Sequence, residues 1–184
     1  SGTKGYPIDI SADSGTYWFS MRMTPDYSAA GAYTGDRTVM GVTGNVYGSG
    51  MTIGVLNNSG AGNQHQYAVQ VYSSTGVGDR AFTGVAAQDG VTVDLLAKLT
   101  VDTAWAPVAN DFMRLWLDPD WKNPAPADGT EDALAAGIAF SDTGNSELLL
   151  MGALQNHGFY VDMIKFGDDY DDVKFMPDPP AFGA

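Results

Sequence analysis

Short runs of apolar, β-branched and aromatic residues alternate with turn-forming residues along most of the chain. Within 66–72 (QYAVQVY), Tyr67 and Val69 alternate with Ala68 and Gln70, as in a strand that buries one face. Runs of the same kind predict strands at 16–23, 36–43, 49–56, 91–102, 112–118, 146–152 and 158–166. Several short strands at this spacing indicate an antiparallel sandwich.

Glycine, proline, aspartate and asparagine separate these runs. The segments 57–63 (NNSGAGN), 74–79 (STGVGD) and 118–129 (DPDWKNPAPADG) predict breaks between strands. The segment 131–138 is rich in alanine but too short for a stable helix, so we interpret it as a loop turn. Since no repeat and no linker divides the 184 residues, the chain forms one domain.

The acidic residues consist of 20 Asp and only two Glu, Glu131 and Glu147. Asp competes with the backbone for hydrogen bonds and collects in turns, caps and calcium loops, whereas Glu suits helix interiors. Together with 23 glycines, this composition disfavours a helical bundle and favours a loop-rich β protein.

The formal net charge is 9 − 22 = −13, which disfavours nucleic acid and anionic membrane surfaces as partners. The longest apolar run, 148–154, is far shorter than the ~20 residues that a membrane-spanning helix needs. No cysteine is present for zinc-finger or thiol chemistry. The sequence begins at Ser1, which fits an exported product after removal of its signal peptide, although cleavage of a tag leaves the same kind of start. We expect an extracellular or cell-surface location.

Two motifs far apart in the chain carry a resemblance to a known family. An opening strand contains Trp18-Phe19-Ser20-Met21, and a late strand contains Asp162-Met163-Ile164-Lys165-Phe166-Gly167, followed by Asp172-Val173. This order resembles the concanavalin A-like or laminin G-like jelly roll of exported bacterial proteins, in which a W-x-S-x strand pairs with a D-x-I-x-x-G strand. Where that family often has an acidic residue after the late-strand Asp, this chain has Met163.

The resemblance implies an all-β, two-sheet antiparallel jelly-roll sandwich over residues 11–175. We expect an extended N-terminal segment at 1–10 and a proline-rich C-terminal tail at 176–184. This architecture hosts lectins, glycan-binding modules, glycosidases, lyases and structural modules, so the fold by itself leaves the function open.

Catalytic motifs are scarce. A retaining or inverting glycosidase needs two facing carboxyl groups, and the E-x-D-x-E strand that supplies them in the glucanase branch of this fold is absent. A lyase needs His and Tyr with Arg or Gln on one concave face, and His65 with Gln64, Gln66 and Tyr67 is the sole cluster of that type. Because His65 adjoins a glycine-rich loop, we interpret it as an exposed loop residue. We therefore expect no enzymatic activity.

Carboxylates near the last strand raise the question of a metal. Asp118, Asp120, Asp162 and Asp168 supply hard oxygen ligands of the kind that Ca²⁺ prefers, and jelly rolls of the resembled family often carry a structural Ca²⁺ near the last strand. The alternative is a solvated acidic tail and a proline turn. The chain has no EF-hand loop, and no cofactor other than a structural Ca²⁺ is expected.

A sugar ring packs its apolar face against an exposed aromatic ring. Trp18 and Trp116 lie in strands among apolar residues, so we expect them in the core. The loop and turn aromatics are the candidates for a glycan platform: Trp105, Trp121, Tyr27, Tyr33 and Tyr47. Loop tryptophans also serve as anchors, and the two interpretations stay open at this point. Asn57 begins an Asn-Asn-Ser sequon and is a glycosylation candidate.

Both termini combine apolar and proline residues, which suggests contacts with neighbouring copies. Ile8 and Ile10 alternate in the N-terminal segment, and Phe175 and Phe182 flank prolines in the tail. Our leading expectation is a non-catalytic, self-assembling structural subunit of a surface filament or lattice, whose partners are other copies of itself. The alternative is a carbohydrate-binding module, with a polysaccharide as partner, and the third hypothesis is a glycosidase or polysaccharide lyase.

Overall fold

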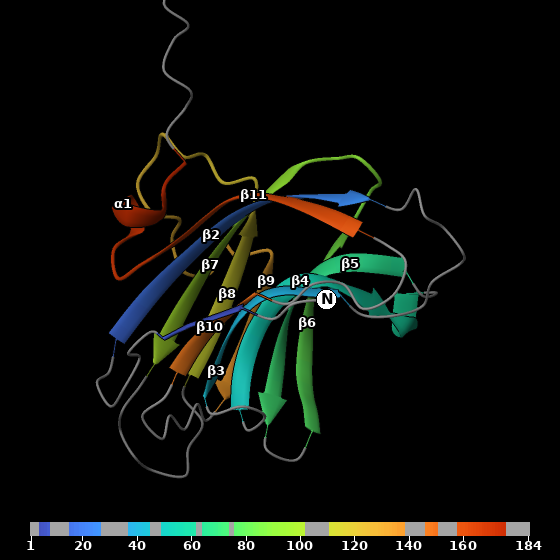
Figure 1. Ribbon diagram of the computed structural model, residues 1–184, viewed down its shortest axis with the longest axis horizontal. Coiled ribbons are helices and arrows are strands. Elements are labelled where there is room, and N and C mark those ends of the chain that lie inside the picture. Colours follow the sequence, from blue (N-terminus) through green and yellow to red (C-terminus); the bar gives the residue numbers. More distant parts are fainter. Residues whose placement is uncertain are drawn as a thin grey trace, which may run out of the picture.

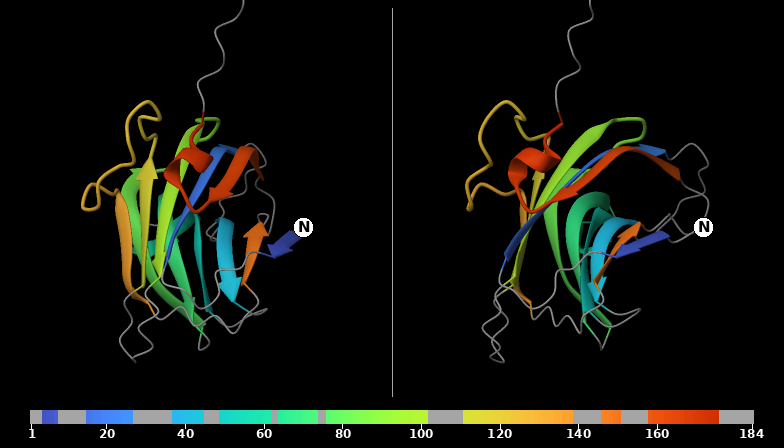
Figure 2. Two further views of the ribbon diagram at one scale, coloured as in Figure 1. Left: turned by 90° about the vertical axis from the view of Figure 1, so that its left-hand side faces the viewer. Right: turned by 60° about the vertical axis from the view of Figure 1, so that its left-hand side comes forward.

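The computed structural model of the chain describes residues 4–7, 15–26, 37–44, 49–61, 64–73, 76–101, 111–138, 146–150 and 158–175. Its two antiparallel sheets lie face to face as a sandwich, which confirms the predicted fold class (Figures 1 and 2). The described residues include no helix that is long and apolar enough to cross a membrane.

Six strands form the first sheet, in the order β1-β10-β3-β4-β5-β6. Their bounds are Lys4–Pro7 for β1, Ser146–Leu150 for β10, Arg37–Gly44 for β3, Ser49–Asn58 for β4, Gln64–Ser73 for β5 and Gly76–Ala86 for β6. A short 3-10 helix at Ser59–Ala61 connects β4 to β5. β1 falls within the predicted extended N-terminal segment and pairs with β10 at the sheet edge.

Five strands form the second sheet, in the order β11-β2-β7-β8-β9. Their bounds are Gly158–Gly167 for β11, Gly15–Asp26 for β2, Val93–Val101 for β7, Asp111–Leu117 for β8 and Ala133–Ile138 for β9. A single helical turn, α1 (Tyr170–Val173), follows β11. It lies beside the loop after β8, at one end of the molecule (Figures 1 and 2).

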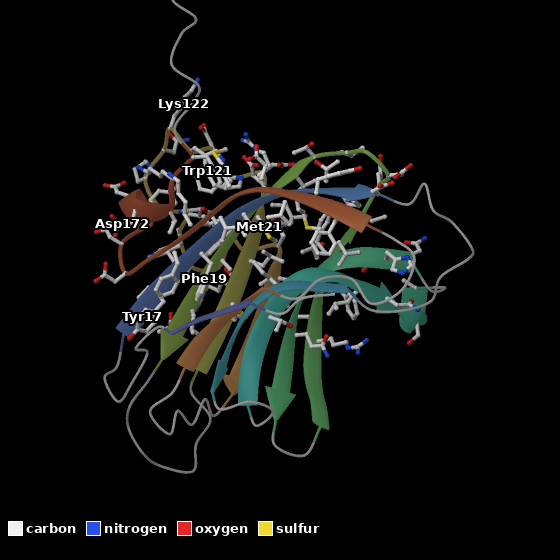
Figure 3. The ribbon with its side chains drawn as sticks, in the orientation of Figure 1. Tyr17, Phe19, Met21, Trp121, Lys122 and Asp172 are labelled. Carbon is white, nitrogen blue, oxygen red and sulfur yellow. The ribbon has the colours of Figure 1, made fainter. Side chains whose placement is uncertain are left out.

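Strand alternation builds the core between the sheets. Phe19 and Met21 of β2 point toward the opposite sheet, and Figure 3 shows them in the space between the layers. Tyr67 and Val69 of β5 meet them from the other side, as the alternation in 66–72 predicts. The residues between these positions therefore point away from the core on each sheet.

Two segments with turn-like composition are strands. Segment 74–79, predicted as a break, contains the start of β6, which pairs with β5 through two register shifts. Gly84, with φ +77°, lies within one of them, where the extra residues need a left-handed backbone that glycine adopts easily. Segment 131–138, predicted as a loop turn, contains β9, because pairing with β8 buries Ala133 and Ala135. Tertiary pairing overrides local preference at both places.

The two halves of the sequence motif pair as expected. Trp18 lies opposite Gly167 and Phe19 opposite Phe166, in the β2–β11 ladder. The Ser20 hydroxyl donates a 2.6 Å hydrogen bond to the Val173 carbonyl and so fastens α1 to β2. These motif residues therefore hold β2, β11 and α1 together.

Trp18 and Trp116 are buried, but in a second cluster on the outer face of the five-stranded sheet. Their rings stack at 6.0 Å between centroids, and Tyr170 and Val173 of α1 cover them. The prediction that both residues lie in a core is confirmed, and the structure adds that this core is the second cluster, because both side chains point away from the opposite sheet.

Candidate functional site

Trp121 is the one member of the predicted glycan platform that lies within the described residues; Trp105, Tyr27, Tyr33 and Tyr47 fall outside them. The Trp121 indole N–H donates a 2.8 Å hydrogen bond to Asp94, and its ring packs against Tyr170 and Phe175. In Figure 3, Trp121 lies on the outer side of β2, toward α1. These contacts make it an anchor of the loop after β8.

Asp94 is the centre of this anchor. It accepts two hydrogen bonds from Arg22, at 2.6 and 2.9 Å, in addition to the one from Trp121. The Arg22 guanidinium in turn lies 5.2 Å from the centre of the Phe175 ring. Burial raises the pKa of the Tyr170 phenol in the same cluster. The polar groups around Asp94 on the outer face of this sheet are thus occupied by contacts within the protein.

The candidate metal ligands do not converge. Asp118 accepts a hydrogen bond from the Asp94 N–H, and Asp120 accepts from Lys122 and Asn123 within its own turn. No group of three or more His, Asp or Glu side chains able to hold a metal ion occurs in the described part of the chain. Asp162 and Asp168 are exposed. Structural calcium therefore stays a prediction.

The assembly candidates Ile8, Ile10 and Phe182 lie outside the described residues. Phe175 is buried against Trp121, so this ring is part of the fold rather than a surface offered to a neighbour. Asn57, the glycosylation candidate, lies in β4 opposite His65 of β5, and its side-chain oxygen is buried.

The predicted His65 cluster is divided by strand alternation. Tyr67 points into the core, whereas Gln66 lies on the outer face of the six-stranded sheet and accepts a 2.9 Å hydrogen bond from Asn58. Gln66 and Tyr67, adjacent in the sequence, therefore cannot act on one ligand.

A different polar row crosses this outer face. Thr52 of β4 lies opposite Gln70 of β5, and Gln70 lies opposite Arg80 of β6. Gly54 and Ala68 form the neighbouring pair of outward positions, so small residues flank the row. Thr52 and Gln70 are each about 1% exposed, whereas Arg80 is half-buried.

Two oxygen atoms of this row lack partners. Thr52 Oγ1 and Gln70 Oε1 are buried without a hydrogen bond within the described structure. A buried polar atom without a partner costs about 1–3 kcal/mol, so such atoms are uncommon and point to a function or to bound water. Together with Arg80, the register neighbour of Gln70, the row combines two acceptors with a fixed positive charge.

Sequence reasoning missed Thr52, Gln70 and Arg80 as a group. The run 66–72 did place Gln70 on the polar side of β5. The pairing of three strands, which no local pattern encodes, was required to bring the other two beside it.

No protein-family model and no curated protein sequence matches this chain. Among solved structures, the fold is similar to alginate lyase Aly36B, with a TM-score of 0.55, 10% identity, and coverage of 86% of this chain and 71% of that one. A variant of that enzyme in complex with alginate tetrasaccharide matches with a TM-score of 0.51 and 12% identity, covering 87% and 70% of the two chains. A variant in complex with alginate trisaccharide also gives 0.51, at 10% identity, covering 89% and 74%. At these identities the likeness shows the fold.

These similarities correct two expectations. We expected a non-catalytic, self-assembling structural subunit without enzymatic activity, and the solved structures with a similar sandwich include alginate lyases. The absence of an E-x-D-x-E strand counts against a glucanase-type site alone, because a lyase breaks its bond by elimination and needs no pair of facing carboxyl groups. The first hypothesis is therefore withdrawn.

Proposed function

We propose that this protein is an extracellular polysaccharide lyase of the concanavalin A-like class, acting on a uronate-containing polysaccharide across the outer face of its six-stranded sheet. The observation that carries the proposal is the row Thr52–Gln70–Arg80, in which two buried acceptors without partners share one register line with an arginine. The lyase fold of the similar structures and their alginate ligands support the same substrate class.

The chemistry assigns a task to each group. In the elimination, a base removes the proton from the carbon next to the uronate carboxylate, the bond to the leaving glycosidic oxygen breaks, and that oxygen takes up a proton. The Arg80 guanidinium pairs with the carboxylate and so stabilises the negative charge that develops as the proton leaves. Thr52 Oγ1 and Gln70 Oε1 accept hydrogen bonds from sugar hydroxyls and hold the ring in register.

The test is the ultraviolet absorbance of the unsaturated uronate product, measured with alginate and a panel of other uronate polysaccharides. We expect the parent protein to release product from at least one of them, and Arg80→Ala to lower kcat/KM by at least a hundredfold. Lys122→Ala, which removes an exposed positive charge in the loop after β8 of the other sheet, serves as the control and is expected to keep the parent rate.

Gln70→Met replaces the amide with an apolar chain of similar length, and it separates folding from function. We expect Gln70→Met to keep or raise the melting temperature while it weakens substrate binding. A parent protein that releases no unsaturated product from any uronate polysaccharide, or an Arg80→Ala variant with the parent rate, would refute the proposal.

A further inference from the structure

Three strands at one end of the five-stranded sheet present an exposed row on its outer face. Tyr160 of β11 lies opposite Thr24 of β2, and Thr24 shares a 2.7 Å hydrogen bond with Thr92, directly before β7. Tyr160 is 68% exposed, the highest value among the large hydrophobic residues described as exposed. An aromatic ring thus stands beside two hydroxyl groups, on the opposite sheet from the proposed catalytic row.

Asp162 completes the arrangement. It follows Tyr160 by two residues, so both side chains lie on the same face of β11, about 7 Å apart along the strand. Asp162 is exposed and forms no hydrogen bond or ion pair with another described residue. Its neighbour across the ladder, Arg22, is engaged with Asp94. The carboxylate is therefore available to a ligand.

We propose that this surface, Tyr160 with Thr24, Thr92 and Asp162, is a second carbohydrate site that binds a neutral pyranose unit of a polysaccharide. A pyranose presents an apolar face of C–H groups that packs on the Tyr160 ring. The spacing along the strand is close to the width of a sugar ring, which brings hydroxyls at the edge of a stacked ring toward Asp162, while Thr24 and Thr92 provide both donors and acceptors.

Charge selects a neutral sugar over a uronate. Asp162 lies on the surface itself, and Asp26 and Asp89 lie at the adjoining ends of β2 and of the turn before β7. A uronate carboxylate on Tyr160 would meet these like charges, and Arg22, the described cation opposite Asp162, is already paired with Asp94. The hydroxyls of a neutral sugar meet no such repulsion.

The geometry of the edge argues against a peptide strand as the occupant. The β2–β11 register shifts between Asp162 and Ile164, and Met163 has φ +52° at this bulge. A bulge interrupts the row of backbone groups that an added strand would need. Recognition here therefore depends on side chains, and Tyr160 provides most of the contact area.

The experiment is native electrophoresis of the full chain in gels that contain laminarin, glucomannan, xyloglucan or dextran, with alginate as the acidic comparator. We expect at least one neutral polysaccharide to retard the parent protein. Tyr160→Ala is expected to weaken that association about tenfold or more, and Tyr160→Phe, which keeps the ring, to retain most of it. Leu134→Ala, at the opposite edge of the same sheet and 39% exposed, is the matched control and is expected to match the parent.

The two proposals fail separately. Arg80→Ala is expected to keep its retardation in the neutral gel, because Arg80 lies on the other sheet. Since Tyr160 is exposed, its replacement is expected to leave the melting temperature within a degree or two, which checks that the variant is folded. Absence of retardation by all four neutral polysaccharides, or equal retardation of Tyr160→Ala and the parent, would overturn the inference.

Discussion

Replacement of Thr52 by valine tests the premise of the proposed site. Thr52 is about 1% exposed, and its hydroxyl has no partner in the described structure. Valine has nearly the same shape, so Thr52→Val removes the cost of a buried polar atom without a partner and leaves no cavity. From a cost of about 1–3 kcal/mol per atom, we expect the free energy of unfolding to rise by about 1 kcal/mol.

Ser20→Ala is the matched control, because it removes a buried hydroxyl that does have a partner. The Ser20 hydroxyl donates to the Val173 carbonyl at 2.6 Å, so its loss leaves that carbonyl without this bond. We expect the free energy of unfolding to fall by about 2 kcal/mol. The two variants each delete one buried hydroxyl and are predicted to change stability in opposite directions.

The assay is urea denaturation followed by tryptophan fluorescence, with a melting curve as a second measurement. For a domain of this size, 1 kcal/mol corresponds to a shift of about 2–4 °C in the melting temperature. Equal m-values would show that the variants unfold from equally compact states. A Thr52→Val protein destabilised by 1 kcal/mol or more would refute the reasoning, because its hydroxyl would then have a partner in the folded chain.

Three further predictions concern the opposite sheet. Trp121→Phe keeps an aromatic ring but loses the hydrogen bond to Asp94, and we expect a loss of about 1–3 kcal/mol in urea denaturation; parent-like stability would contradict an anchoring role. Gly167→Ala places a Cβ 2.5 Å from Asp172 Cβ, so we expect the free energy of unfolding to fall by about 1–3 kcal/mol. The Gly167→Ala/Asp172→Gly double variant removes the second Cβ and is expected to recover part of that loss; a double variant as unstable as the single one would argue against this clash. The hydrogen bond from Lys98 is the main cause of the lowered pKa of Asp128. The ion pair therefore stabilises the fold above the ordinary pKa of 3.8, and this stabilisation is lost as the pH falls through the lowered pKa. The difference in melting temperature between the parent and Asp128→Asn should accordingly disappear in acid, and a constant difference would contradict the pairing.

The strand content and the layer architecture were predictable because alternation is a local property. The run 66–72 identifies β5 and its buried side from the residues themselves, since the side-chain period of a strand is two. The motif pairing was predictable for another reason. Trp18 and Gly167 lie in the two motifs that carry the resemblance to the jelly-roll family, and these motifs face each other in the β2–β11 ladder.

Local composition misled wherever a partner strand determined the conformation. β6 begins in a segment that composition marks as a break, and β9 is built from alanines, yet both complete a sheet edge. The role of Trp121 was undetermined for the same reason. Its loop composition suits a ligand platform, but Asp94, 27 positions earlier in the chain, satisfies its N–H.

By itself, the sequence determined that this protein is a β-sandwich with an acidic, aspartate-rich surface, because periodicity and composition act over a few residues. Tertiary structure alone decided which polar groups share a surface. Thr52, Gln70 and Arg80 come from three strands, and Tyr160 and Thr24 are separated by most of the chain. Hydrogen-bonded register between distant strands brings these side chains together, and a register is a property of the pair of strands that neither strand encodes alone.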